Sequence, residues 1–171
     1  MDADARDVAH RIFVVRERVP VQRAGAMTLL YPRREAARLG PSLTVTELAG
    51  LDVSANQRPL AWHRDASEPH AFHLDVPEGT QTIDVRFQIV ADDDRLSADV
   101  VAIAWQHLLL YPAGWYARNI AVTPSVQLPT GLTSPLPRTT GRSLWSSCST
   151  HRSSLDVTLR ACRSRRTVQA L

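Results

Sequence analysis

Up to about residue 127, apolar and polar side chains alternate along the chain, which is the period of a β-strand with one buried face. Residues 82–90 show it most cleanly, because positions 83, 85, 87 and 89 are apolar and the positions between them are polar. Similar alternation, or short apolar runs bounded by Pro, Gly and Asp, predicts further strands at 12–19, 27–31, 51–55, 60–64, 71–76, 100–105, 107–110 and 118–128.

Turn and helix signals refine this picture. Asn56-Gln57-Arg58-Pro59 lies between two predicted strands, 51–55 and 60–64, and indicates a β-hairpin. Helical periodicity is weak. Residues 33–39 are expected to form one or two turns, and residues 2–8 a fraying helix or a disordered start.

Many short strands spaced about 8–12 residues apart are typical of an antiparallel sandwich or a saddle-like sheet. The chain has 171 residues, of which 44% are hydrophobic, enough for the core of one domain. No internal repeat is present. We therefore predict a mainly β domain over residues 1–131, followed by a disordered tail over 132–171.

The tail is set apart by its composition. Residues 1–127 hold 13 Arg and 16 acidic residues, a formal charge of −3, whereas 128–171 hold 7 Arg and only Asp156, a formal charge of +6. Both cysteines, Cys148 and Cys162, lie in this Ser/Arg-rich segment, which has too few apolar residues to offset its chain entropy on folding. All 20 basic residues are Arg, so nucleic-acid binding, which usually mixes Arg and Lys, is disfavoured.

Signatures of common catalytic and membrane classes are missing. No apolar run is long enough for a membrane span, and no signal peptide precedes Asp2. The sequence contains no His-Glu-x-x-His, no phosphate-binding Gly motif and no Gly-x-Ser-x-Gly. His70 and His73 are three apart on a predicted strand, so they are expected to face opposite sides rather than share a metal, and Asp92-Asp93-Asp94 is expected to be a solvated turn.

Four aromatic residues gather late in the β region: Trp105, Tyr111, Trp115 and Tyr116. Such a cluster is either a ligand platform, as in sugar-binding sandwiches, or a hydrophobic seam that docks on another domain. We favour the docking surface. A stand-alone β-sandwich module that binds carbohydrate or protein is the alternative.

Specific strings, rather than composition, point to a family. They are Leu29-Leu30-Tyr31-Pro32, the segments 48–56, 59–65 and 71–79, and Leu109-Leu110-Tyr111-Pro112-Ala113-Gly114. In this order, over residues 8–131, they resemble the N-terminal β domain of the glycyl aminopeptidase-like zinc metallopeptidases, metallopeptidase family sixty-one.

The resemblance implies a division of labour. In such peptidases the N-terminal domain packs on a thermolysin-like catalytic domain, which carries the zinc and His-Glu-x-x-His and is usually followed by a PDZ domain. The intact parent would release N-terminal Gly or Ala from peptides. Family members often carry a signal peptide, but the location of the present protein is left unknown by its sequence. No residue of this chain matches a catalytic, cofactor-binding or metal-ligand motif, so this chain alone is expected to be inactive and to hold no cofactor.

The chain also departs from the family pattern. The family has an aromatic residue and a Pro-Gly turn after Tyr31-Pro32, and a strand before the position of Asp2. Reading Ser143 to Ser154 two bases later, with permitted codons, gives Ala-Val-Val-Glu-Leu-Leu-Asp-Ser-Pro-Leu-Val, which resembles the family's continuation. We therefore hypothesise that residues from about 132 onward are read out of frame. Sheet edges and a docking face without their partner would favour self-association.

Overall fold

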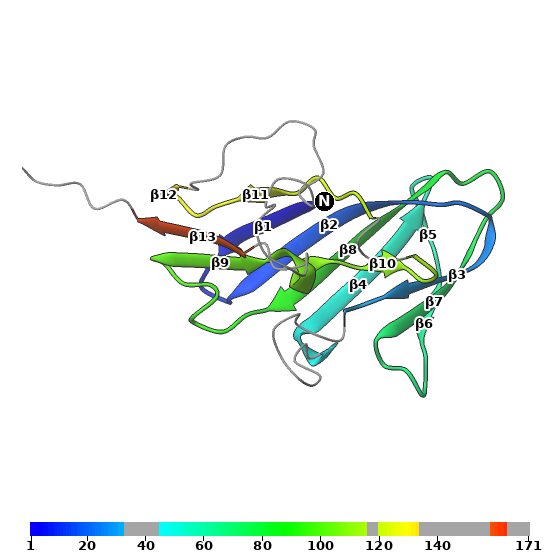
Figure 1. Ribbon diagram of the computed structural model, residues 1–171, viewed down its shortest axis with the longest axis horizontal. Helices are drawn as coiled ribbons and strands as arrows, with labels where there is room; N and C mark the ends of the chain where they lie inside the picture. Colours follow the sequence, from blue (N-terminus) through cyan, green and yellow to red (C-terminus); the bar gives the residue numbers. More distant parts are fainter. Residues whose placement is uncertain (33–44, 116–119, 134–157, 164–171) are drawn as a thin grey trace, which may run out of the picture.

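A computed structural model describes residues 1–32, 45–115, 120–133 and 158–163. The chain is mainly β, as the alternation predicts (Figure 1). Its elements are β1 (Asp2–Asp7), β2 (Ile12–Pro20), β3 (Gly25–Leu30), the 3₁₀ turn η1 (Val45–Glu47), β4 (Leu48–Ala55), β5 (Arg58–Pro59), β6 (Trp62–Arg64), β7 (Ala71–Val76), β8 (Thr82–Val90), β9 (Val100–Ala104), the 3₁₀ turn η2 (Trp105–Leu108), β10 (Tyr111–Pro112), β11 (Ser125–Gln127), β12 (Leu132–Thr133) and β13 (Thr158–Arg163).

The largest sheet has the strand order β11-β1-β2-β8-β4-β5. Its centre is the long antiparallel pair of β2 and β8, in which Val15 lies opposite Phe87 and Val19 opposite Ile83. Every second side chain of both strands is buried, so the period-2 pattern directs one face of this sheet to the core. One pair is not antiparallel, because β11 joins β1 in the parallel direction after the long connection from β10.

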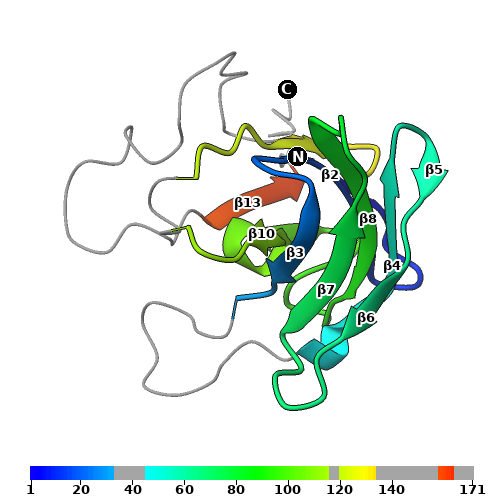
Figure 2. The same ribbon diagram turned by 90° about the vertical axis from the view of Figure 1, so that its right-hand side faces the viewer.

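A second sheet, β10-β3-β7-β6, covers this face (Figure 2). Its buried residues, among them Leu29, Phe72 and Leu74, belong to the same apolar core as Phe13 and Phe87 of the first sheet. Two packed sheets that share one core form a sandwich, which confirms the predicted fold class.

The N-terminal segment corrects one expectation. Residues Asp2–Asp7 form strand β1, paired with β2 and β11, rather than a helix or a disordered start. Ala3 and Ala5 are buried on its inner side. Alanine is a poor strand former, so the local sequence gives little β signal, and pairing on both edges decides the conformation.

The predicted hairpin is correct only in its first half. Residues Asn56 and Gln57 form a two-residue turn with positive φ at both positions, and the chain returns along β4 as the short strand β5. The next strand, β6, pairs instead with β7 in the second sheet. The half-buried Leu60 and the exposed Ala61 therefore connect the two sheets rather than extend one hairpin.

A third sheet, β12-β13-β9, includes two short pieces of the predicted disordered tail. Strand β13 pairs with the free edge of β9, from Thr158 opposite Ala104 to Cys162 opposite Val100. Backbone pairing with an exposed edge needs no apolar side-chain surface, which is why composition gave no signal for it.

The remainder of the tail and the expected helical turns at 33–39 lie outside the described residues. In the part of the chain that is described, no helix is long and apolar enough to cross a membrane.

Candidate functional site

The histidines belong to a polar network rather than to a metal site. His73 lies on β7, with its Nε2 2.8 Å from Asp65 Oδ2 and its Nδ1 2.9 Å from Thr28 Oγ1. The hydrogen bond with His73, followed by those from Ser67, lowers the pKa of Asp65 to about 2. The Asp65 carboxylate accepts from the Nε2–H of His73, and the Thr28 hydroxyl contacts the other ring nitrogen. This network joins β3, β7 and the loop before β7.

The other two candidate groups have structural contacts as well. His70 precedes β7 and its ring stacks on Tyr31 at 6.1 Å between centroids, whereas His73 contacts Asp65 and Thr28. Asp92 caps the turn after β8 by accepting from the backbone N–H of Arg95, and Asp93 pairs with Arg11. Within the described ranges, no group of three or more His, Cys, Asp or Glu side chains could hold a metal ion.

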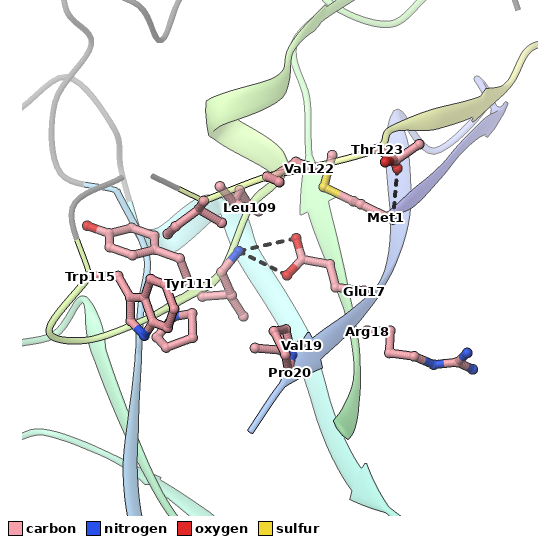
Figure 3. Close-up of a pocket in the computed structure, with 14 residues that line it drawn as sticks. Met1, Glu17, Arg18, Val19, Pro20, Leu109, Tyr111, Trp115, Val122 and Thr123 are labelled. Carbon is pink, nitrogen blue, oxygen red and sulfur yellow. Dashed lines mark hydrogen bonds between the residues drawn. The ribbon is translucent and has the colours of Figure 1, made fainter. Parts of the chain in front are cut away.

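Of the four aromatic residues of the predicted docking surface, three are described, and Trp105 lies apart from Tyr111 and Trp115. Trp105 begins η2 and is buried in the core, so it cannot form part of an exposed surface. Tyr111, on β10, and Trp115 both line one cavity (Figure 3). Trp115 is 40% exposed, an unusual value for a side chain of this size. Tyr116 lies outside the described residues.

The cavity lies between the end of β2, the segment around β10 and the residues before β11 (Figure 3). Its volume is about 420 Å³. Most of its lining is apolar: Met1, Val19, Pro20, Leu109, Leu110, Pro112, Ile120, Ala121 and Val122, with Tyr111 and Trp115. The remaining lining residues are Glu17, Arg18 and Thr123.

Glu17 is a site residue that the sequence analysis did not single out. It occupies an inward position of β2, between the buried Val15 and Val19, and is only 5% exposed. A sequence signal was available, because Glu17 interrupts the apolar side of an otherwise regular alternation. Charged residues are rarely buried without a partner, so a charged residue at an inward strand position indicates a specific contact or a functional site.

The contacts of Glu17 are few. Both of its carboxylate oxygens lie 3.2 Å from the backbone nitrogen of Leu110, which donates to them. Burial raises the pKa of Glu17 well above its ordinary value, and the Leu110 N–H and the positive charge of the Met1 amino terminus oppose that rise only in part. The arrangement is suited to binding an apolar group that carries a positive charge.

Comparison with known proteins decides the family. The chain matches the Peptidase M61 N-terminal domain family over residues 1–151. It belongs to this family. The match extends past residue 131, where the composition of the chain changes. Among curated proteins no match was found.

A solved structure supports the fold of this Peptidase M61 N-terminal domain. The crystal structure of the aminopeptidase N family protein from Idiomarina loihiensis superposes with a TM-score of 0.67 at 14% sequence identity. The superposition covers 95% of the present chain and 26% of the Idiomarina chain. The chain thus spans about a quarter of the length of the protein it resembles, and a domain of this family is the N-terminal part of a larger peptidase.

Proposed function

We propose that this chain is a non-catalytic supporting domain, which packs through Tyr111, Trp115 and the cavity between them onto the zinc-dependent catalytic domain of a family M61 aminopeptidase. The intact peptidase would release N-terminal Gly or Ala from peptides. Zinc would activate the attacking water there, and a PDZ domain would follow the catalytic domain. The present chain would contribute the sheet scaffold.

The observation that carries the proposal is the exposure of Trp115 beside an apolar cavity, in a domain whose family forms the N-terminal part of longer peptidases. Large aromatic side chains are enriched in interface centres, where they fill pockets of the partner and lose their hydration. Two large apolar side chains among the described residues are exposed, Trp115 and Val90. Val90 ends β8 and does not line the cavity, so it provides a matched control.

Docking can be tested with the catalytic domain of an M61 peptidase produced without its own N-terminal domain. We expect the 171-residue chain to bind it in analytical ultracentrifugation, and Trp115→Ala to weaken binding by at least about tenfold, since hot-spot aromatics contribute about 2 kcal/mol or more. Val90→Ala should leave binding unchanged. Equal binding by wild type and Trp115→Ala would refute this docking surface.

Activity gives a second readout. The chain alone should not hydrolyse Gly- or Ala-p-nitroanilide, with or without added zinc. Zinc-dependent hydrolysis by the purified chain would overturn the assignment of a supporting role. Binding of a glycan array that is lost in Trp115→Ala, without binding to the catalytic domain, would favour the alternative of a stand-alone binding module.

A further inference from the structure

When the buried carboxyl group of Glu17 is ionised, the described residues satisfy it only in part. An ionised carboxylate accepts about four hydrogen bonds. Among the described residues Glu17 receives one donor, the backbone N–H of Leu110, at 3.2 Å from each oxygen. A buried acid with so few donors favours a positively charged partner.

Among the described residues that line the cavity, the two that carry a positive charge have other hydrogen-bond partners. Arg18 follows Glu17 on β2, but its side chain points away from Glu17 and its Nε lies 3.1 Å from Asp84 Oδ1 (Figure 3). The amino terminus of Met1 lines the same cavity and donates to the carbonyl oxygen of Thr123 at 3.2 Å. In the part of the chain that is described, no ion pair reaches Glu17.

The position of Leu110 discriminates between the two common cationic side chains. Its N–H lies equidistant from both carboxylate oxygens, which is the approach that a bidentate arginine fork would use. An ammonium group is a compact point charge and needs only one oxygen, so it can approach Glu17 from the cavity. The sequence contains no lysine, so no side chain of residues 1–171 can supply such an ammonium group.

The walls of the cavity suit the aliphatic part of such a side chain. Leu109, Tyr111, Trp115 and Val122 surround the approach to Glu17 (Figure 3). The volume of about 420 Å³ falls in the range of about 300–1,000 Å³ that is typical of ligand sites. Lysine buries its four-carbon stem along apolar surface while its charged end keeps polar contacts.

We propose that this cavity binds a primary ammonium group on an aliphatic stem, with Glu17 as its counterion, and that its occupant is a lysine side chain of the catalytic domain. The identity of the occupant rests on the proposed function, because it requires this face to be the docking surface. The ammonium site itself does not. It also explains why a charged residue occupies a core position of β2, where an apolar residue would pack with less desolvation cost.

Titration calorimetry of the 171-residue chain with small probes tests the site. N-acetyl-lysine methylamide should bind at least about tenfold more tightly than N-acetyl-norleucine methylamide, which has a similar stem without the charge, because a hydrogen bond to a charged group contributes about 1.5–3 kcal/mol. Glu17→Gln should abolish this preference. Glu78→Gln, at an exposed turn after β7, should retain it.

The apolar wall of the cavity can be tested separately from Glu17. Trp115→Ala should weaken the binding of both probes, because it removes part of the apolar wall while leaving Glu17 in place. Equal binding of the two probes, or an unchanged preference in a folded Glu17→Gln variant, would overturn the ammonium site. Tighter binding of leucine methylamide, which offers an amino-terminal ammonium, would overturn the assignment to a lysine side chain. These outcomes differ from failure of the proposed function, which would appear as a lack of binding to the catalytic domain.

Discussion

Glu17 on β2 and the backbone nitrogen of Leu110 meet at 3.2 Å, although 93 residues separate them in the chain. A second side-chain bond acts on the same segment, because the Tyr31 hydroxyl donates to the carbonyl oxygen of His107 at 3.0 Å. Together these bonds hold the segment that runs from η2 to β10. They connect the central strand of the large sheet to the residue that precedes Tyr111 in the wall of the cavity.

Substitution of Glu17 should separate its role as an acceptor from its charge. Glu17→Ala leaves the buried Leu110 N–H without its acceptor and should destabilise the fold by about 1–3 kcal/mol relative to Glu17→Gln, which keeps an acceptor oxygen. Glu17→Gln should be at least as stable as wild type at pH 7, because it removes a buried acid. Urea unfolding measures both differences. Equal stability of the Ala and Gln variants would mean that the Leu110 contact contributes nothing.

The raised pKa of Glu17 predicts a dependence of stability on pH. The native state retains the Glu17 proton above pH 4.5, where the unfolded chain loses it, so the native state binds more protons. The free energy of unfolding should therefore fall as the pH rises from 4.5 through the native pKa of Glu17. Other groups titrate in this range, so the observable is the difference between wild type and Glu17→Gln. A constant difference from pH 4.5 to 8 would contradict the prediction.

Asp65 should produce the opposite dependence at low pH. Its pKa is lowered from 3.8 to about 2, first by the hydrogen bond with His73, so its stabilising effect is present above 3.8 and is lost as the pH falls toward 2. We expect the melting temperature of wild type to exceed that of Asp65→Asn above pH 4 and the two to converge near pH 2. Asp75→Asn, an exposed position on β7, is the control and should show no such convergence.

The turn between β4 and β5 contains a strained residue that can be relieved. Gln57 has a φ of 63°, a left-handed conformation that costs a side-chain-bearing residue about 1–2 kcal/mol. Gln57→Gly creates the Asn-Gly pair preferred in this turn and should raise the free energy of unfolding by about 1 kcal/mol. Gln81→Gly, at an exposed position where φ is not positive, should lower it instead. Thermal denaturation of both variants checks the sign of each effect.

Frame and oligomeric state remain predictions from the sequence. The hypothesis that residues from about 132 onward are out of frame is tested by the nucleotide sequence, which should encode a zinc-peptidase continuation with His-Glu-x-x-His in a neighbouring frame.

Self-association through uncovered edges and the docking face should appear as concentration-dependent sedimentation. A monomer of high, cooperative stability would argue against it.

The sequence by itself determined the strands whose alternation is regular, such as Thr82–Val90 and Ala71–Val76, because the period of the side chains alone fixes which face is buried. It also carried the strings that resemble the family, and these need no coordinates. The sequence did not predict strands β1 and β13, because their pairing depends on sheet edges supplied by distant segments.

The candidate site was decided by the tertiary structure. Two tryptophans close in sequence were separated, with Trp105 placed in the core and Trp115 at the surface. Glu17 meets the backbone of Leu110 because the segment from η2 to β10 lies beside β2 in the folded chain. Local periodicity specifies which face a side chain occupies, but not which distant backbone atom it meets there, because that choice depends on how the sheets pack together.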